Sequence, residues 1–438
     1  MSSDRLEYVP LSDIAEINPR KDVRLSGEST PVSFIPMGDV SESGVWENQQ
    51  TRPLGKVDSG YTSFKEGDVL FAKITPCMEN GKGCHARNLV NGHGFGSTEF
   101  HVLRAIEGVS DARFLYHWTR TPMLRLKAES AMSGSAGQQR VSTWFFDEFR
   151  VPRIPLPEQR RIADVLDTVD AAIQETDRVV EKQEQVKTGL LQDLLTRGLD
   201  ADGRLRDPER ESEAFRETEL GRRPVEWEIK QVGKLLTGIT QGWSPKCHPD
   251  PAPQGQWGVL RTTSVQWGGF KEDENKALPS DLSPRPEYEV EPMDILMTRA
   301  GPASRVGVVA MVGNVRDKLL LSDKLYRLEH GNDILPGFLY AALSSEEVQG
   351  LLGREKTGMA GSQTNISQRI VKGLLLPYPP LDEQERIVSV LEEHSNRIAS
   401  EDAYSEKLQC LKTGLMQDLL TGRVRVPETE DRVDEVLA

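Results

Sequence analysis

A ten-residue stretch occurs twice in this chain of 438 residues. "KTGLLQDLLT" begins at Lys187 and "KTGLMQDLLT" begins at Lys412, so the second copy starts 225 residues after the first. At the same offset, residues 155–196 and 380–421 align without a gap and share 21 of 42 residues. A repeat of this length is not chance, and its period is far too long for a solenoid. The chain is therefore a duplication, and its fold must contain this segment twice.

Both copies have the apolar pattern of a long helix. In the first copy, apolar or permissive residues recur mostly in steps of three and four from Ile162 to Leu194, and Thr176 and Gln183 are the polar members of this stripe. The second copy keeps the same register from Ile387 to Leu419. This spacing, sustained over so many residues, predicts a coiled coil. Polar residues interrupt the second stripe at His394, Glu401, Ser405 and Lys412.

Glycines recur at matching positions of the two predicted helices. Gly198 and Gly422 follow the last periodic leucines, where C-terminal caps are expected. Gly189 and Gly414 lie inside the helices, where each costs about 1 kcal/mol relative to alanine. We expect the interior glycines to mark a close approach of the backbone to the other helix; the alternative is an inherited glycine that is merely tolerated.

The segments between the helices are mixed in character. Short β-like runs such as "DVLFAKI" from Asp68 and "DKLYRLE" from Asp323 alternate with loops rich in glycine and proline. The two segments share few residues, yet "KEGDVLFAKITP", "RFLYHWT" and "GSAGQQRVS" correspond in order to "VEPMDILMTRAGP", "GFLYAAL" and "GMAGSQTNIS". We therefore predict one fold kept twice. The expected boundaries are a mixed α/β domain at 1–157, a helix at 158–198, an exposed linker at 199–223, a second mixed α/β domain at 224–379, a helix at 380–422 and a tail at 423–438.

The net charge of −14 at first argues against a nucleic-acid partner. The two helices, the linker and the tail carry −11 of it, however, which leaves only −3 for the two mixed domains. A nearly neutral domain can still present a basic face, because binding depends on local patches.

Other bulk features favour a cytoplasmic chain. No run of 18 apolar residues occurs, and the first residues lack the basic and apolar regions of a signal peptide. The four cysteines form no CxxC pair, and the spacing of Cys77, Cys84 and the neighbouring histidines fits no standard zinc site. We predict free thiols and no metal.

The helix ends and the second half of the chain resemble a known family. "PLPEQRRIADVLD" and "PPLDEQERIVSVLE" open the helices, "KTGLLQDLLTRG" and "KTGLMQDLLTGRVRV" close them, and "FRETELGRRPVEWE" starts the second half. With "ILMTRAG" and "GSQTNIS", these stretches resemble the specificity subunit of Type I restriction–modification enzymes over essentially the whole chain. The first domain departs most, because it has "AKITPC" where that family often has an arginine–glycine loop.

The resemblance implies an α+β fold in which two target-recognition domains are separated by an antiparallel coiled coil, with pseudo-twofold symmetry. Each recognition domain would read one half of a split double-stranded DNA target, which should be asymmetric because the domains have diverged. Two methyltransferase subunits would dock on the chain and motor–nuclease subunits would join them. The subunit itself would catalyse nothing and bind no cofactor; S-adenosylmethionine, Mg²⁺ and ATP are expected on the partner subunits.

Candidate base-reading residues lie on the glycine-rich loops. Arg and Lys suit guanine, and Asn and Gln suit adenine. In the first domain the candidates are Lys73, Asn80, Lys82, Gln138, Gln139 and Arg140. In the second domain they are Arg299, Ser304, Arg305, Ser362, Gln363, Thr364 and Asn365. For any one of them, the alternative is an exposed loop residue or a phosphate contact, which positions the protein without specifying sequence.

Catalytic motifs are absent from the sequence: we find no phosphate-binding G-x-x-x-x-G-K-[ST] loop, no G-x-S-x-G and no HExxH. "GHGFGS" leads into a strand instead of following one, and "LPYPPL" lacks the polar residue of an amino-methyltransferase motif. Two other hypotheses remain beside the leading one. The chain could serve a fused methyltransferase–nuclease system, or it could be a coiled-coil scaffold whose globular ends bind proteins.

Overall fold

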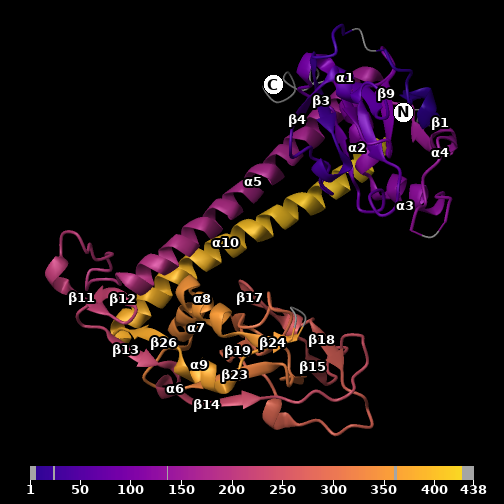
Figure 1. Cartoon of the computed structure of the whole chain (residues 1–438). Helices are drawn as coiled ribbons and strands as arrows, with labels where there is room; N and C mark the ends of the chain where they lie inside the picture. The colour runs from indigo at the N-terminus through magenta and orange to yellow at the C-terminus, as the bar shows by residue number, and fades with distance from the viewer. Residues whose placement is uncertain (1–5, 23–24, 136, 360–362, 427–438) are drawn as a thin grey trace, which may run out of the picture. The chain divides into compact units, whose positions relative to one another are not determined.

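The structure is a computed structural model that describes residues 6–22, 25–135, 137–359 and 363–426. The chain divides into two compact units. The first unit contains the described residues of Met1–Arg178 and Asp402–Ala438, and the second is Val179–Glu401. Each unit therefore combines one mixed domain with half of each long helix (Figure 1). Among the described helices, none has an apolar stretch long enough to cross a membrane.

Both long helices predicted from the repeat are present. They are α5 (Leu156–Thr196) and α10 (Leu381–Leu415), and α10 continues into a π-helical turn, η7 (Met416–Leu420). The 41 residues of α5 make a helix roughly 60 Å long at 1.5 Å per residue. Gly198 and Gly422 follow these helices with φ of +65° and +71°, which confirms the predicted C-terminal caps.

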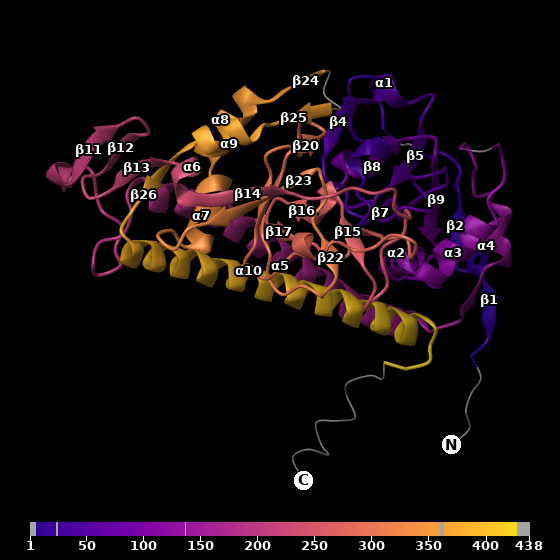
Figure 2. The same cartoon turned by 90° about the horizontal axis from the view of Figure 1, so that it is seen from below.

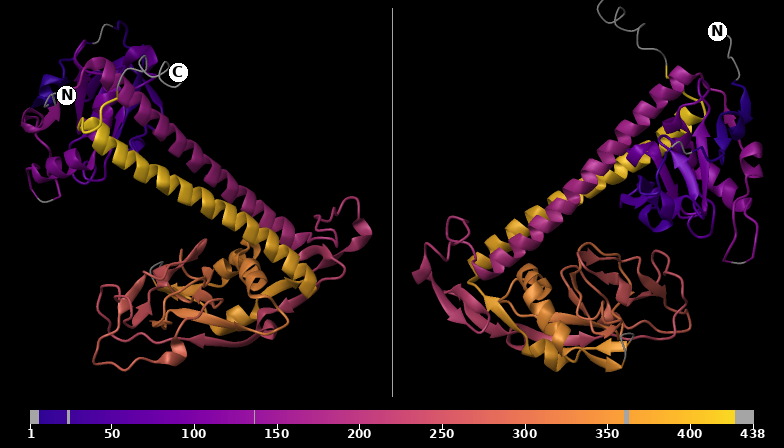
Figure 3. Two further views of the ribbon diagram at one scale, coloured as in Figure 1. Left: turned by 180° about the vertical axis from the view of Figure 1, so that it is seen from behind. Right: turned by 45° about the horizontal axis from the view of Figure 1, so that its top comes forward.

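Within each unit, α5 and α10 run antiparallel and lie side by side (Figure 3). In the first unit, the Ser405 hydroxyl donates to Asp177 Oδ1 at 2.7 Å, and Lys412 Nζ lies 2.5 Å from Asp170 Oδ1. Seven residues forward along α10 thus match seven residues backward along α5, which is the heptad register of an antiparallel coiled coil. Two of the polar interruptions in the second stripe are therefore paired with carboxylates of the other helix.

The expectation for the interior glycines is wrong. At both Gly189 and Gly414, an added Cβ would have no described atom within 4 Å, and both residues are exposed. The coiled coil therefore does not require glycine there. The close approaches occur at the caps instead, where a Cβ at Gly198 would collide with Glu383 Oε1 and one at Gly422 would collide with Leu6 Cδ1.

The first domain has two four-stranded sheets. One sheet has the order β2-β9-β6-β7, and the other has the order β4-β3-β8-β5, in which β3 and β8 are parallel. The strands of these sheets are β2 (Ala15–Ile17), β3 (Pro31–Ile35), β4 (Gln50–Pro53), β5 (Thr62–Lys65), β6 (Val69–Ala72), β7 (Gly83–His85), β8 (His93–Gly96) and β9 (Phe100–Ala105). The domain's helices are α1 (Leu54–Val57), α2 (Ala112–Arg120), α3 (Pro122–Ser130) and α4 (Trp144–Glu148), and β1 (Tyr8–Pro10) pairs with β10 (Arg150–Pro152).

The second domain repeats this topology. Its four-stranded sheet has the order β14-β23-β19-β21, and a three-stranded sheet has the order β18-β15-β22, with β15 and β22 parallel. These strands are β14 (Leu236–Gln241), β15 (Gly258–Leu260), β18 (Asn275–Ala277), β19 (Ile295–Thr298), β21 (Val309–Met311), β22 (Leu319–Leu320) and β23 (Leu325–His330). The domain also contains α6 (Val232–Leu235), α7 (Pro336–Ser344), α8 (Glu346–Glu355), α9 (Gln368–Gly373), the pair β13 (Glu228–Gln231) and β26 (Leu375–Tyr378), the hairpin β16 (Val265–Gln266) and β17 (Gly269–Phe270), and the sheet β20 (Ala300–Gly301), β25 (Gln363–Asn365) and β24 (Thr357–Met359). In Figure 2, β20, β25 and β24 lie together at one end of this domain. The predicted duplication of one mixed α/β fold is confirmed.

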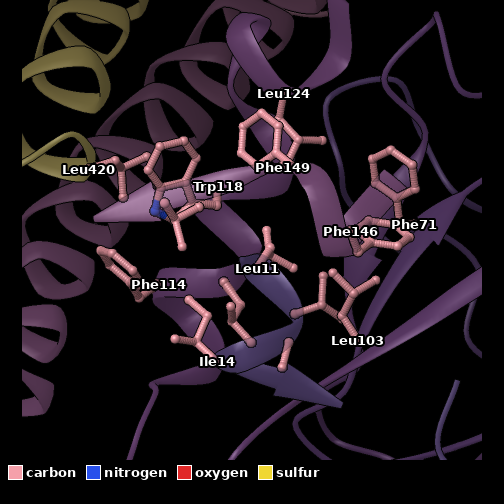
Figure 4. Packing of buried hydrophobic residues seen from close by; sticks show 14 of the residues in the cluster. Leu11, Ile14, Phe71, Leu103, Phe114, Trp118, Leu124, Phe146, Phe149 and Leu420 are labelled. Atoms are coloured by element: carbon pink, nitrogen blue, oxygen red, sulfur yellow. The ribbon is translucent and has the colours of Figure 1, made fainter. Parts of the chain in front are cut away.

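Each domain's core is completed by both long helices. In the first unit, Ile162 and Leu166 of α5 belong to the buried cluster of the domain. Leu420 of η7 joins the same cluster and lies near Trp118 and Phe114 (Figure 4). In the second unit, the equivalent cluster contains residues of both helices and of the domain: Leu194, Leu195, Trp227, Phe338 and Ile387. The start of one helix and the end of the other therefore pack against the same domain.

The Glu-Gln pair that is repeated at the start of each long helix makes equivalent contacts in both units. Glu383, whose side chain is 2% exposed, accepts hydrogen bonds from the Leu199 backbone N–H at 2.8 Å, Arg206 Nη1 at 2.5 Å and Trp227 Nε1 at 3.0 Å. It thus ties the start of α10 to the chain that leaves α5.

Glu158 makes the reciprocal connection in the first unit. It accepts from Arg425 Nε at 2.8 Å and from the Val426 N–H at 3.0 Å, just after the end of α10. Burial alone would raise the pKa of Glu158, but hydrogen bonds from Arg425 and Val426 outweigh burial and hold the pKa below its ordinary value.

The glutamine beside each glutamate fastens the helix to its domain. Gln159 Oε1 accepts from the Asp111 N–H at 3.0 Å, next to the start of α2. Gln384 Oε1 accepts from the Leu335 N–H at 3.0 Å, next to the start of α7. In each domain, the equivalent glutamine therefore holds the start of the long helix against the start of a domain helix, α2 or α7.

The segment expected as an exposed linker, 199–223, is mostly exposed but also structured. Leu199, Phe215 and Arg223 are buried, and β11 (Phe215–Thr218) pairs with β12 (Gly221–Pro224) as a hairpin. The Arg223 guanidinium reaches Glu347 of α8 at 2.8 Å. The segment is therefore anchored to the second domain at several points.

Substitution of Glu383 tests the junction. We expect Glu383→Ala to lower the free energy of unfolding by about 3–5 kcal/mol, because it leaves the Arg206 charge and two N–H donors without their buried acceptor. The exposed Glu385, on the same turn of α10, is the matched control, and Glu385→Ala should stay within about 0.5 kcal/mol of the parent. Urea unfolding of the three purified chains gives both values; a loss below about 1 kcal/mol for Glu383→Ala would contradict this account.

Candidate nucleic-acid interface

In the first domain, the loop after β6 is held between two other segments. The Lys73 N–H donates to Glu99 O at 2.9 Å, and Lys73 O accepts from the Val141 N–H at 2.9 Å. The Thr75 N–H donates to Gln139 O at 3.0 Å. These bonds bring Lys73 together with the segment that carries three other candidates, Gln138, Gln139 and Arg140.

The second domain has the same backbone arrangement. The Arg299 N–H donates to Lys324 O at 2.9 Å, and Arg299 O accepts from the Ile366 N–H at 3.0 Å. The bridge between Ile74 and Arg140 in the first domain corresponds to the pairing of Ala300 with Asn365 in the second. We call this shared arrangement of three segments, around Lys73, Glu99 and Arg140 or around Arg299, Lys324 and Asn365, the recognition frame.

The frame of the second domain borders an open pocket of about 490 Å³. Its lining comprises Thr262, Arg299, Ala300, Gly301, Lys324, Thr364 and Asn365. Three of the residues predicted from sequence, Arg299, Thr364 and Asn365, therefore meet at one concave surface. Two cationic side chains and an amide there supply the donors that guanine and adenine edges or phosphates accept.

Arg140 is engaged within the first domain. Its Nε and Nη2 donate to the two oxygens of Glu99 at 2.9 and 2.8 Å, and Nη1 donates to Gln138 O at 3.1 Å. The hydrogen bonds from Arg140 lower the pKa of Glu99, and the same bonds raise the pKa of Arg140. Arg140 thus forms a bidentate ion pair, while Gln138 and Gln139 beside it are exposed.

Two contacts within the second domain restrain the guanidinium group of Arg299. Its Nη1 donates to Asp323 O at 3.1 Å, and its guanidinium lies 5.5 Å from the centre of the Tyr326 ring. The Tyr326 hydroxyl donates to Ile366 O at 3.2 Å, so the ring itself is fixed by the frame. An arginine restrained in this way loses less conformational freedom when it binds.

Asn80 and Lys82 lie at the far end of the β6–β7 loop that begins with Lys73. Asn80 Nδ2 donates to Glu42 Oε1 at 2.8 Å, and Lys82 Nζ donates to Met37 O at 3.3 Å. The buried Arg125 stabilises this loop, because its guanidinium donates to Met78 O at 3.0 Å and to Gly81 O at 3.2 Å. The described side-chain hydrogen bonds of these two candidates are therefore with the 37–42 segment, and none of them is with Lys73, Glu99 or Arg140.

The remaining candidates of the second domain differ in their contacts and in how far the structure describes them. Arg305 Nη2 donates to Val265 O of β16 at 3.5 Å, and Ser304 is exposed on the turn before it. Gln363 is described only by its backbone, which pairs with Met359 between β25 and β24. Ser362 lies outside the described residues.

Two frame residues, Glu99 and Lys324, and one residue of the pocket, Thr262, were missed from the sequence. Glu99 and Lys324 each precede the last strand of the main sheet, and their carbonyls hold the loop that begins with Lys73 or Arg299. Thr262 lines the pocket. Glu99 and Lys324 are 225 residues apart, like the repeated helices, so alignment of the two strands at that offset would have found them.

The described part of the first domain contains no group of cysteines and histidines arranged to bind a metal. Among the described residues, no three His, Cys, Asp or Glu side chains are grouped as metal ligands would be. Burial raises the pKa of Cys84 to about 12, so that its thiol is protonated.

Comparison with known proteins places the chain. The family model for the Type I restriction modification DNA specificity domain matches residues 4–183 and 224–409. The chain is 32% identical, over 88% of its length and 77% of the relative's, to the Type I restriction enzyme EcoEI specificity subunit of Escherichia coli. It is 41% identical over 160 residues, 36% of the chain and 27% of the relative, to the EcoAI specificity subunit of Escherichia coli.

The fold agrees with that relationship. A solved structure that concerns complex assembly and conformational transition of the type I R-M system aligns with 96% of this chain and 100% of its own, with a TM-score of 0.56 at 17% identity. The S subunit from M. genitalium aligns with 96% of this chain and 98% of its own, with a TM-score of 0.54 at 13% identity. The family model and the curated relatives identify a class of protein that recognises DNA sequence. The chain belongs to the DNA specificity family of Type I restriction–modification systems, as the sequence motifs predicted.

His101 is a buried titratable side chain that is hydrogen-bonded to the first recognition frame. Asn18 Oδ1 accepts from the Val102 N–H at 3.0 Å, which turns its Nδ2 toward His101 Nδ1 at 3.0 Å. His101 Nδ1 is therefore an acceptor, and its Nε2–H donates to Val141 O at 2.8 Å. Burial lowers the pKa of His101, in keeping with a neutral ring in these contacts.

We expect acid to weaken this domain. A lowered folded-state pKa means that the stability contributed by neutral His101 is present above the unfolded pKa of about 6.5 and is lost as pH falls below it. The free energy of unfolding, measured by urea between about pH 7.5 and 5, should therefore fall more steeply for the parent chain than for His101→Gln. His85, whose pKa is lowered to about 4 by burial and by Arg87, contributes in the same direction in both chains. Equal slopes would rule out this role for His101.

Proposed function

We propose that the chain is the non-catalytic subunit that reads a split, asymmetric target in double-stranded DNA, with one half-sequence read by each domain. The observation that carries the proposal is the duplicated recognition frame, which has the same backbone bonds in both domains but different polar side chains. One backbone that presents Lys73, Glu99 and Arg140 in one domain, and Arg299, Lys324 and Asn365 in the other, suits two readers of different sequences.

We propose that the long helices set the unread gap between the half-sequences. Docking geometry makes the spacing of half-sites a geometric quantity. The antiparallel seam supports this role, because its Ser405–Asp177 and Lys412–Asp170 contacts fix the register of the helices in the first unit.

We further propose that two methyltransferase subunits dock on a surface that occurs once on each helix. This surface, the repeat face, consists of exposed residues that are identical in both copies: Thr188, Gly189 and Gln192 on α5, and Thr413, Gly414 and Gln417 on α10 and its continuation η7. Identical exposed residues at equivalent places suit two copies of one partner. Since no described atom lies within 4 Å of a Cβ at either glycine, a partner's backbone has room to approach.

The chemistry is then supplied by other chains, in the cytoplasm. S-adenosylmethionine would bind to the methyltransferase subunits, and ATP and Mg²⁺ would serve the methyltransferase and motor–nuclease subunits. The relatives support this division of labour, because they are named as specificity subunits of restriction enzymes.

A matched deletion tests the reading and spacing roles together. Continuing the register of the Ser405–Asp177 and Lys412–Asp170 contacts pairs residues 175–181 with 401–407, so removing both keeps the heptad phase and shortens each helix by about 10 Å. At about 3.4 Å per base pair, we expect the gap of the methylated motif to shrink by about three base pairs while both half-sequences stay the same.

The measurement is the genome-wide methylation motif of cells with the parent chain, the shortened chain or neither, each with the partner methyltransferase gene. A continuous motif, or a motif that persists without the chain, would overturn the proposed function. Altered half-sequences with an unchanged gap would refute the spacing role alone.

Substitution of the two glycines of the repeat face tests whether the methyltransferase subunits bind there. Gly189→Ala with Gly414→Ala should raise the free energy of unfolding by about 1 kcal/mol per site, because alanine is the better helix former and meets no neighbour. The same double variant should bind the methyltransferase subunits more weakly, measured by sedimentation of the complex. Gly350→Ala, on α8, where an added Cβ also meets no described atom within 4 Å, is the control for helix propensity without docking. Undiminished assembly by the more stable double variant would refute the docking surface.

A further inference from the structure

Glu99 and Lys324 occupy the same position in the two domains. Each residue directly precedes the last strand of its main sheet, β9 or β23. Each carbonyl accepts from the backbone N–H of the frame's first residue, Lys73 or Arg299, at 2.9 Å. The backbone is thus the same, and the side chains differ in the sign of their charge.

The surroundings of the two side chains differ accordingly. The Glu99 carboxylate is paired with Arg140 at 2.8 Å, and both side chains remain partly exposed, by 27% and 41%. Lys324 is 54% exposed, lies 3.5 Å from the Asp323 carboxylate and borders the pocket with Arg299 and Asn365. Neither side chain is buried in a structural contact that would remove it from a ligand.

A carboxylate on a DNA-binding surface needs a specific reason. It is repelled by phosphates, so it belongs where a base offers a donor, such as the exocyclic amino group of cytosine in the major groove. Its bidentate pairing with Arg140 offsets the repulsion and leaves an acceptor and N–H donors side by side. A lysine at the same place suits the two acceptors of guanine instead.

We propose that Glu99 and Lys324 determine the base specificity of the first and the second domain at equivalent positions of the two half-sequences. The first half-sequence then contains, at this position, a base with a major-groove amino group, cytosine or adenine. The second half-sequence contains guanine there. This inference rests on the proposed function, because it takes each domain to be the reader of one half-sequence.

Two charge-removing variants test the proposal. Glu99→Gln keeps an oxygen acceptor for Arg140 but loses the charge, and Lys324→Gln loses the ammonium group. We expect each variant to relax one position of its own half-sequence, with discrimination reduced about tenfold or more, while the other half-sequence and the gap stay unchanged. The intact half-sequence reports that the chain folds and assembles.

Exposed residues of like charge serve as controls. The control variants are Glu107→Gln and Lys234→Gln. Glu107 lies beyond the far end of β9, and Lys234 lies on α6. Neither variant should alter the motif. The readout for all five chains is the genome-wide methylation motif, with the fraction methylated at every single-base variant of it.

The outcomes separate the two levels of inference. If the parent chain gives no split motif, the proposed function fails. If it gives a split motif that both variants leave unchanged at every base, with or without weaker methylation overall, the side chains only position their neighbours or contact phosphates, and the present inference is overturned. If Glu99→Gln abolishes methylation altogether, Lys324→Gln decides: relaxation at one base supports the proposal, and an unchanged motif refutes it.

Discussion

Two buried glutamates hold this architecture together. Glu158 and Glu383 begin the long helices, and each binds the chain that emerges from the end of the other helix. Because a buried carboxylate is costly unless it is fully hydrogen-bonded, each glutamate requires the start of its own helix and the chain that leaves the other helix to be in place. The junction therefore fixes, within each unit, the one arrangement in which the start of one helix packs beside the end of the other.

This arrangement explains why the helices resemble each other far more than the domains do. Each helix must supply the same glutamate, glutamine, apolar stripe and capping glycine to complete a domain's core, so its sequence has little freedom. The domains need to keep only the backbone bonds of the recognition frame. Side chains that project from the frame can change without loss of the fold, as the exchange of Glu99 for Lys324 illustrates.

Much of the fold could be predicted from the sequence because the evidence for it is local or repeated. The period of the apolar residues and the glycines after the last leucines predict the helices and their ends, and both are present. The prediction for Gly189 and Gly414 was wrong for an instructive reason: a glycine within a helix shows that a side chain is absent, but it does not show which surface faces the space.

The sequence by itself determined that this chain is a duplication with two long helices, because a repeated pattern of residues is readable without any contact. Only the tertiary structure decided how the candidate polar residues are grouped. Arg140 pairs with Glu99 from 41 positions away, whereas Asn80 contacts Glu42 on another loop. Such pairs are set by backbone hydrogen bonds between distant segments, and no local pattern of residue types reports which segments those bonds bring together.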